Sequence, residues 1–254
     1  MDISADISEP GMPISESNAP PSQVEVRQYV PQRKRLHSPK TFEDRAALGV
    51  RELRVPATWE QYLELADTCD YRVHYREGQI ISFLEIEEKT GTVMGEATIP
   101  HEKLVMRFGT QLSILLDDLK SEYNVLGSNT KIFIGENRRG YNADVTVVKG
   151  EPVLQEYQVY KRKSKGLINP WLIVEVLSNS TRDFDLSEKL NDYKQIPGLQ
   201  QIIFAEQGKL WVSTYIRVSE KEWQNLDFDT ITDIIPIAEG AGKLSLAKIF
   251  ARIF

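Results

Sequence analysis

The sequence "WLIVEVLSNSTRDFDLSEKLNDY" at residues 171–193 decides how the fold of this chain is interpreted. Residues 168–177 are nearly continuous in apolar side chains, which is typical of a strand covered on both faces. Side chains alternate along a strand, so Ile173, Glu175 and Leu177 are expected to share one face. Glu175 is therefore expected to be a buried carboxylate, and a buried carboxylate must be paired, protonated or bound to a cation.

The polar residues that follow this strand predict a helix at about residues 184–195. Ser180, Thr181 or Asp183 can cap its beginning, and apolar residues then recur at spacings of three and four. Lys189 lies at the edge of the face that turns inward. A helix packed back across the strand end could carry the Lys189 ammonium to Glu175; the alternative is an ordinary exposed lysine.

A second carboxylate, Asp144, begins the apolar stretch "NADVTVV" at residues 142–148. Asp is common at the ends of strands, so Asp144 alone is compatible with a structural role. Glu175 follows about thirty residues later on what we expect to be a neighbouring strand. Two carboxylates on adjacent strands can converge on a hard divalent cation such as Mg²⁺, which prefers oxygen ligands.

The remaining patterns predict one mixed α/β domain at residues 41–254, with a central sheet flanked by helices. Residues 1–40 are rich in proline and serine and show no hydrophobic period, so we expect a disordered tail. The expected elements are a helix capped by Thr58, a hairpin turning at Glu77-Gly78, a long helix at 100–120, strands at 124–134, 142–148 and 168–177, the helix at about 184–195, strands at 200–206 and 210–218, and a final helix at 244–253.

The composition is that of an ordinary globular chain, with 41% hydrophobic and 27% charged residues. The single cysteine, Cys69, excludes an intramolecular disulfide and a cysteine-rich zinc site. No apolar run approaches the roughly 20 residues that span a bilayer, and no secretory signal is recognised, so we expect a cytoplasmic protein. The net charge of -6 offers no global attraction for nucleic acid. The basic clusters at 33–35 and 161–165 are expected to be solvated tail or loop charges.

Three segments together resemble the Uma-two family, a branch of the PD-(D/E)XK nuclease superfamily. They are "ADVTVV", "LIVEVLSNSTRDFDLSEKLNDYKQIPGLQQIIFAE" and "IPHEKLVMRFGTQL", and the resemblance covers about residues 55–218. It implies a restriction-endonuclease-like fold, in which a central mixed sheet flanked by helices carries a metal site at its centre.

The resemblance also implies roles for individual residues. Asp144 and Glu175 match the two acidic positions that bind Mg²⁺, or Mn²⁺ in its place, and the Val176 carbonyl is the implied third ligand. The superfamily's lysine usually stands two residues after the second acid, where this chain has Leu177; in this family it comes from the following helix, which matches Lys189. The implied activity is metal-dependent hydrolysis of DNA phosphodiester bonds by an endonuclease, with Lys189 stabilising the reacting phosphate or positioning the attacking water.

Two positions depart from the family pattern. Ala143 stands where a proline is usual, and His74 stands where a glutamate normally supports the metal. An imidazole there is expected to weaken Mg²⁺ binding or to favour a softer ion. His101 matches the histidine at the head of the long helix, and its alternative is a structural residue at the helix start.

Further expectations concern the partners. Cutting both DNA strands favours paired sites, so we expect a homodimer. On the helix that starts at Pro100, Lys103 and Arg107 are spaced to face a nucleic-acid backbone. The alternative function is a catalytically weak or inactive nuclease-fold protein that acts as a DNA-binding or assembly module. Action on RNA is ranked last, because the sequence has no aromatic-rich motif for stacking bases.

Overall fold

The computed structural model describes residues 38–86, 93–94, 97–119, 122–135 and 138–254. The tail expected at 1–40 and the basic cluster at 33–35 lie outside the described residues, except for residues 38–40. The first helix, α1 (Phe42–Ala47), begins after an N-cap at Thr41, whose hydroxyl accepts a hydrogen bond from the Asp44 N–H.

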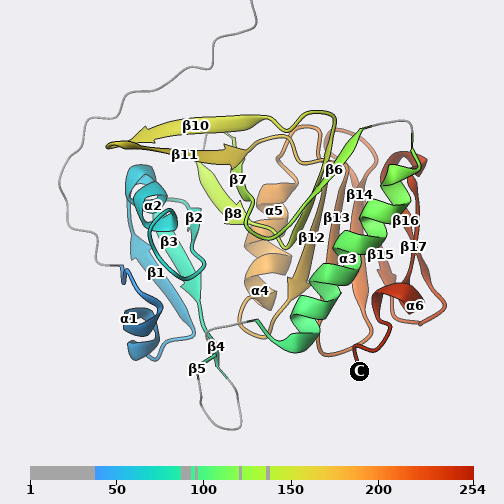
Figure 1. Ribbon diagram of the computed structural model, residues 1–254, viewed down its shortest axis with the longest axis horizontal. Helices are drawn as coiled ribbons and strands as arrows, with labels where there is room; N and C mark the ends of the chain where they lie inside the picture. Colours follow the sequence, from blue (N-terminus) through green and yellow to red (C-terminus); the bar gives the residue numbers. More distant parts are fainter. Residues whose placement is uncertain (1–37, 87–92, 95–96, 120–121, 136–137) are drawn as a thin grey trace, which may run out of the picture.

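A six-stranded mixed sheet lies at the centre of the fold (Figure 1). Its one parallel pair joins β12 to β13, with Glu175 opposite Phe204. The other neighbours in this sheet are antiparallel. The strands, in spatial order, are β15 (Trp223–Phe228), β14 (Val212–Arg217), β13 (Gln201–Glu206), β12 (Leu172–Leu177), β9 (Val145–Lys149) and β6 (Tyr123–Leu126).

A second, seven-stranded sheet lies beside the first and includes the predicted hairpin. The turn of this hairpin is made by Glu77 and Gly78, both of which have positive φ, as a tight two-residue hairpin turn requires. The strands, in spatial order, are β1 (Glu52–Pro56), β3 (Gln79–Phe83), β2 (His74–Arg76), β8 (Arg139–Asn142), β7 (Lys131–Ile134), β11 (Arg162–Leu167) and β10 (Leu154–Val159). Two small two-stranded sheets pair β4 (Glu85–Ile86) with β5 (Val93–Met94), and β16 (Ile234–Ile237) with β17 (Gly242–Ser245).

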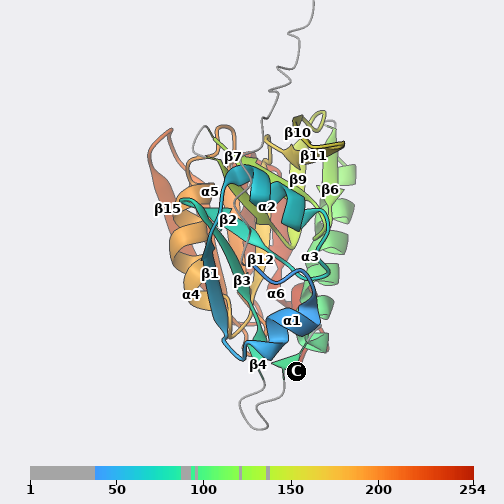
Figure 2. The ribbon, with the colours of Figure 1, turned by 90° about the vertical axis from the view of Figure 1, so that its left-hand side faces the viewer.

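Helices cover both faces of the six-stranded sheet (Figure 2). The long helix α3 (Ile99–Asp117) packs one apolar side against one face, and its buried side chains are Leu104, Phe108, Leu112 and Leu116. The opposite face is covered by one helical run, made of α4 (Arg182–Phe184), the π-helical turn η1 (Asp185–Lys189) and α5 (Leu190–Tyr193). This run also contacts the seven-stranded sheet, because one apolar cluster joins Ile132 and Tyr141 to Ile173 and Leu190.

The outer face of the seven-stranded sheet is covered by α2 (Trp59–Ala66). Its capping box pairs Thr58 with Gln61, and Trp59 packs edge-on against Tyr75 and Phe133. The predicted mixed α/β fold, with sheets flanked by helices, is confirmed.

Four predicted details differ from the structure. The strand expected at 124–134 is two strands, β6 and β7, which belong to different sheets because the chain turns at residues 127–130. The basic cluster at 161–165 lies at the turn and in the second strand of the β10–β11 hairpin, not in a loop. The last helix is shorter than predicted: β17 runs to residue 245 and α6 is Leu246–Ile249. Several elements were not predicted, namely α1, β1, β5, β8, β10, β11, β15, β16 and β17. A 3-10 turn, η2 (Ala238–Gly240), follows β16.

Within the described residues, no helix combines the length and the apolar character needed to cross a membrane.

Candidate active site

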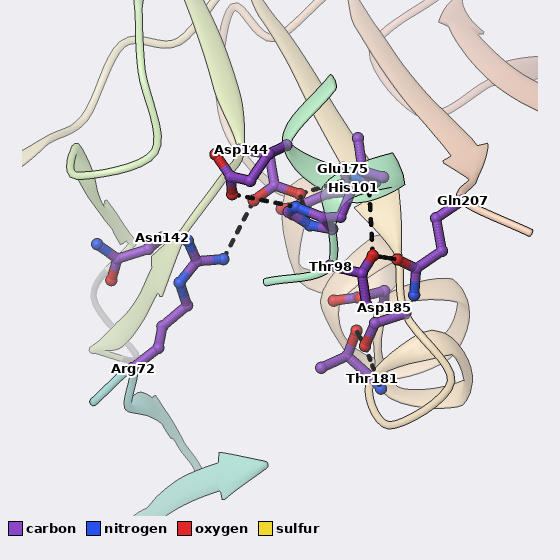
Figure 3. Close-up of polar contacts among 12 residues, drawn as sticks. Arg72, Thr98, His101, Asn142, Asp144, Glu175, Thr181, Asp185 and Gln207 are labelled. Atoms are coloured by element: carbon purple, nitrogen blue, oxygen red, sulfur yellow. Dashed lines mark hydrogen bonds and ion pairs between the residues drawn. The ribbon is translucent and has the colours of Figure 1, made fainter. Parts of the chain in front are cut away.

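The strands β9 and β12 separate at the point where the two acidic residues lie. Their antiparallel pairing ends at Val174 and Val145, so the next position along each strand is Glu175 on β12 and Asp144 before β9. Beyond that point the Val176 N–H bonds to a side chain of the neighbouring segment rather than to its backbone: it donates a 2.8 Å hydrogen bond to Asp144 Oδ2. Upstream of Asp144 the chain enters β8 and the other sheet. We call this place, where the two sheets part, the fork (Figure 3).

Asp144 is held by two further donors. The Arg72 guanidinium lies 3.1 Å from Oδ1, and His101 Nε2 lies 3.4 Å from Oδ2. Burial alone would raise the pKa of Asp144, but His101, Arg72 and the Val176 N–H together hold it well below its ordinary value. Asp144 is therefore an ionised carboxylate, although its side chain is only 3% exposed.

Glu175 lies on the face of β12 that α4, η1 and α5 cover, as its alternation predicts. Its Oε1 accepts a 2.6 Å hydrogen bond from the Tyr193 hydroxyl and lies 2.8 Å from Lys189 Nζ. Burial raises the pKa of Glu175 to about 7, and the neighbouring Asp144 adds to this rise although Lys189 opposes it. Glu175 therefore differs from Asp144: one carboxylate is firmly ionised and the other can take up a proton near neutral pH.

Lys189 reaches the fork from the π-helical turn η1. Its ammonium lies 2.8 Å from Glu175, 3.2 Å from Asp185 Oδ1 and 3.4 Å from the Asn142 carbonyl oxygen. Burial would lower the pKa of Lys189, but the charges of Asp185 and Glu175 outweigh burial and raise it. Lys189 is therefore a buried, permanently charged ammonium, and each of its three protons has an oxygen within reach.

His101 and His74 lie on opposite sides of this cluster. His101 stands in the first turn of α3, after the Thr98 N-cap, and the charge of Asp144 raises the pKa of His101 against the effect of burial. His74 is buried on β2 against the rings of Phe83, Tyr141 and Phe184.

The His74 imidazole is neutral at pH 7. Burial, followed by the charges of Lys189 and Arg72, lowers the pKa of His74 well below its ordinary value. Among the described residues, His74 Nδ1 has no hydrogen-bond partner. The structure thus brings Asp144, Glu175, Lys189 and His101 into direct contacts and places His74 beside them without a polar contact.

Three site residues were missed by the sequence analysis: Arg72, Asp185 and Tyr193. Asp185 stands four residues before Lys189, a spacing at which helical side chains meet, and Tyr193 stands four residues after it. Arg72 stands two residues before His74. These spacings relative to Lys189 and His74 are the signals that could have identified them.

Lys103 and Arg107 each make a contact with the C-terminal segment. Lys103 Nζ donates to the Arg252 carbonyl at 3.2 Å, and Arg107 Nη1 donates to the Lys248 carbonyl at 3.2 Å. Both side chains stabilise the C-terminal segment against α3. The expectation that they face a nucleic-acid backbone stays a prediction.

A cleft of about 260 Å³ is lined by Arg72 and His101, the two side chains that pair with Asp144. Asp144, Glu175 and Lys189 are not among its lining residues. A larger cavity of about 530 Å³ lies elsewhere, between Phe133 and Ile196, and none of the fork residues lines it. The smaller cleft is therefore the one that adjoins the acidic residues of the fork, through Arg72 and His101. Its walls come from α1, the hairpin, the start of α3 and the turn after β12, and its lining includes Arg72, His74, His101, Ser178, Ser180 and Thr181.

The donor set at the fork suits a hard cation. In the described ranges, no group of three His, Cys, Asp or Glu side chains is arranged to hold a metal ion. Mg²⁺ is commonly held by only one or two carboxylates, with water molecules as its other ligands. Asp144 and Glu175 supply two carboxylates. Val176 can add its carbonyl, because the N–H and C=O of a strand residue point to the same side of the strand.

Comparisons with known proteins bear on the fold and the family of this chain. A model of the Uma2 family, described as "Putative restriction endonuclease", matches residues 59–247. The uncharacterized protein sll1609 of Synechocystis sp. (strain ATCC 27184 / PCC 6803 / Kazusa) is 25% identical over 166 residues, which cover 65% of this chain and 84% of that protein.

A solved structure shares the fold. It is described as a putative nuclease belonging to DUF820 from Anabaena variabilis ATCC 29413, with a TM-score of 0.57 and 15% sequence identity. The match covers 78% of this chain and the whole of that chain.

Proposed function

This chain belongs to the Uma2 family, and from that premise we propose that it is a divalent-metal-dependent endonuclease that hydrolyses DNA phosphodiester bonds. The observation that carries the proposal is the convergence of Asp144, Glu175 and Lys189 at the fork. Two carboxylates and one ammonium that lie close together are the groups that metal-assisted phosphoryl chemistry requires.

The proposed metal ligands are Asp144, Glu175 and the Val176 carbonyl. A bound Mg²⁺, or Mn²⁺, would lower the pKa of a coordinated water and offset charge on the scissile phosphate. Asp144 is ready to bind a cation because it is already ionised, and the Val176 N–H fixes the orientation of its carboxylate. Glu175 must lose its proton first, because burial raises its pKa to about 7.

Lys189 is proposed to stabilise the negative charge that develops on the phosphate or to orient the attacking water. The raised pKa of Lys189 keeps the ammonium protonated, so a role as general base is excluded by its charge state. His101 is proposed to orient Asp144 through its Nε2. His74 adds a neutral ring where the family carries a glutamate, and it therefore leaves the site with one negative charge fewer.

The second candidate function is a nuclease fold retained for DNA binding or assembly. One observation favours it: both carboxylates already have cationic partners, Arg72 for Asp144 and Lys189 for Glu175. In that case the ion pairs would be purely structural, and divalent cations would bind no better to the wild type than to the Asp144→Asn variant.

The test is cleavage of supercoiled plasmid DNA by the purified protein with Mg²⁺ or Mn²⁺. We expect nicking that is abolished in Asp144→Asn and in Glu175→Gln. The matched control is Glu188→Gln, a carboxylate in η1 that pairs with Arg54 and Arg76 away from the cleft, and we expect it to retain activity. Equal cleavage by all four proteins would remove the fork as the active site.

The proposed assembly is a homodimer, because one fork per chain can cut one strand at a time. Light scattering of the eluting protein measures this directly. A dimer mass supports paired cutting, and a monomer that still linearises plasmid would contradict the need for two sites.

A further inference from the structure

Arg72 is the one permanent cation that lines the cleft. Within the described part of the chain, the cleft wall contains no other arginine or lysine. The Arg72 side chain is 45% exposed, whereas the Lys189 side chain is 3% exposed. Arg72 is therefore the cation that an incoming anion meets first.

The hydrogen bonds of the two cations also differ. Each proton of the Lys189 ammonium already has an oxygen within 3.4 Å. The Arg72 guanidinium carries five N–H donors, and among the described residues its one hydrogen bond goes from Nη1 to Asp144 Oδ1. Within the part of the chain that the structure describes, most of the donors of Arg72 have no partner and can bind a second group.

The two oxygens of Asp144 have different partners. Oδ2 is held by the Val176 N–H at 2.8 Å and lies 3.4 Å from His101. Oδ1 contacts only Arg72 within the described ranges. A divalent cation held by Asp144 would compete with Arg72 for this carboxylate, and its positive charge would repel the guanidinium. Arg72 would then need another anion.

The surroundings of Arg72 suit a phosphate. Ser178, Ser180 and Thr181 line the same cleft. The Ser178 hydroxyl lies 3.0 Å from the Ser180 hydroxyl and 3.2 Å from the Thr181 hydroxyl. Arginine binds phosphate oxygens through two parallel N–H bonds, and hydroxyl groups supply further donors. Glu85, the one carboxylate among the other lining residues, accepts a 2.7 Å hydrogen bond from Ser180.

We propose that Arg72 alternates between two anions: it pairs with Asp144 in the resting protein and binds the scissile phosphate of DNA once a divalent cation binds Asp144. This inference rests on the proposed nuclease function and adds a substrate-binding residue to it. Arg72 competes with the metal in the first state and holds the phosphodiester in the second. Removing the charge of Arg72 should therefore weaken the binding of DNA and strengthen the binding of the divalent cation.

The experiment measures both ligands on the Arg72→Gln variant. DNA binding is measured with Ca²⁺ in place of Mg²⁺ over a series of salt concentrations, and Mn²⁺ binding is measured by calorimetry without DNA. We expect DNA to bind about tenfold more weakly, with a salt slope reduced by about one. We expect Mn²⁺ to bind more tightly than to the wild type.

The matched control is Arg138→Gln. Arg138 has nearly the same exposure, 40%, and one ion pair of the same length, 3.1 Å to Glu60, but it lies outside the cleft. We expect its salt slope and its Mn²⁺ affinity to equal those of the wild type. Three results would overturn the proposal. They are an unchanged salt slope of DNA binding in Arg72→Gln, an equal loss of DNA affinity in Arg72→Gln and Arg138→Gln, and weaker Mn²⁺ binding in Arg72→Gln.

A second variant keeps the test decisive if Arg72→Gln does not fold. Arg72→Lys retains the charge beside Asp144 but cannot form two parallel bonds to a phosphate. We expect it to keep the salt slope and to lose about tenfold in DNA affinity; wild-type affinity in Arg72→Lys would overturn the proposal. If the wild type itself shows no Ca²⁺-dependent DNA binding, the proposed nuclease function fails. If the wild type binds DNA and Arg72→Gln has the same salt slope of DNA binding, only the proposed role of Arg72 fails.

Discussion

Replacing Lys189 by methionine is expected to destabilise the fold in a pH-dependent way. The substitution removes an ammonium that lies 2.8 Å from Glu175 and 3.2 Å from Asp185, and both carboxylates are nearly inaccessible to solvent. Removing one partner of a buried ion pair costs about 3–5 kcal/mol, because the remaining charge is left without compensation.

The pH dependence follows from the pKa of the two remaining carboxylates. Burial already raises the pKa of Glu175 to about 7 and raises that of Asp185, while Lys189 opposes both shifts. Without Lys189 both pKa values rise further. The native variant then holds protons that the unfolded chain releases, so its free energy of unfolding falls as the pH rises towards the raised pKa values.

This loss is about 1.4 kcal/mol per pH unit for each carboxylate that stays protonated. For Glu175, the loss of stability relative to the wild type begins near pH 7, because wild-type Glu175 ionises there. At about pH 6 Glu175 is already largely protonated in the wild type. The difference in free energy of unfolding between wild type and Lys189→Met should therefore be about 3 kcal/mol there, the lower end of the range for broken buried ion pairs.

The assay is urea unfolding of wild type and Lys189→Met at about pH 6 and about pH 8.5. We expect a difference of about 3 kcal/mol at the lower pH and of about 5 kcal/mol or more at the higher pH. Lys194→Met is the control: its ammonium lies over the Tyr215 ring at 4.4 Å, and its removal should cost about 1 kcal/mol at both pH values. A Lys189→Met variant within about 1 kcal/mol of the wild type at both pH values would refute the reasoning.

Three further predictions concern the site and the core. Near pH 7, binding of Mg²⁺ should release about half a proton from Glu175, because its pKa is about 7; calorimetry in two buffers of different ionisation enthalpy measures the release, and identical heats would contradict it. His74→Glu adds a carboxylate beside Lys189 and Arg72 and should raise Mg²⁺ affinity on the order of tenfold; calorimetric binding no tighter than that of the wild type would speak against this. Gly166→Ala should lower the free energy of unfolding by about 1–3 kcal/mol, because a Cβ there overlaps the Phe133 ring, whereas Gly208→Ala, which faces open space, should not; similar urea midpoints for both variants would contradict this packing.

The sequence predicted the central strand well because its signal is local. The apolar run around Glu175 and its alternation are properties of ten consecutive residues, and the structure confirms both the strand and the face on which Glu175 lies. The helix after the strand was also predicted from nearby spacing. Its π-helical turn, η1, was not predicted.

The fork was harder to predict because it depends on contacts between distant segments. Residues 124–134 were interpreted as one strand, whereas β6 and β7 pair with different sheets. The separation of β9 from β12 leaves the Val176 N–H for Asp144. Which strands part, and where, is set by the whole sheet order and not by the "NADVTVV" pattern.

Arg72 was missed for a related reason. On a predicted hairpin, a charged residue near a turn is expected to face solvent, and nothing within "DYRVHYREG" distinguishes Arg72 from Arg76. In the structure Arg76 joins the buried Asp192 of α5, while Arg72 reaches Asp144 across 72 residues of sequence. Only the fold separates an arginine in the site from one in a structural ion network.

The central claim is that Asp144 and Glu175 hold one divalent cation, and direct measurement of Mn²⁺ binding to the DNA-free protein tests it most simply. We predict one site per chain in the wild type and in Glu188→Gln, with affinity at least about tenfold weaker in Asp144→Asn and in Glu175→Gln. Equal Mn²⁺ affinity in all four proteins, or no Mn²⁺ binding to the wild type, would contradict it.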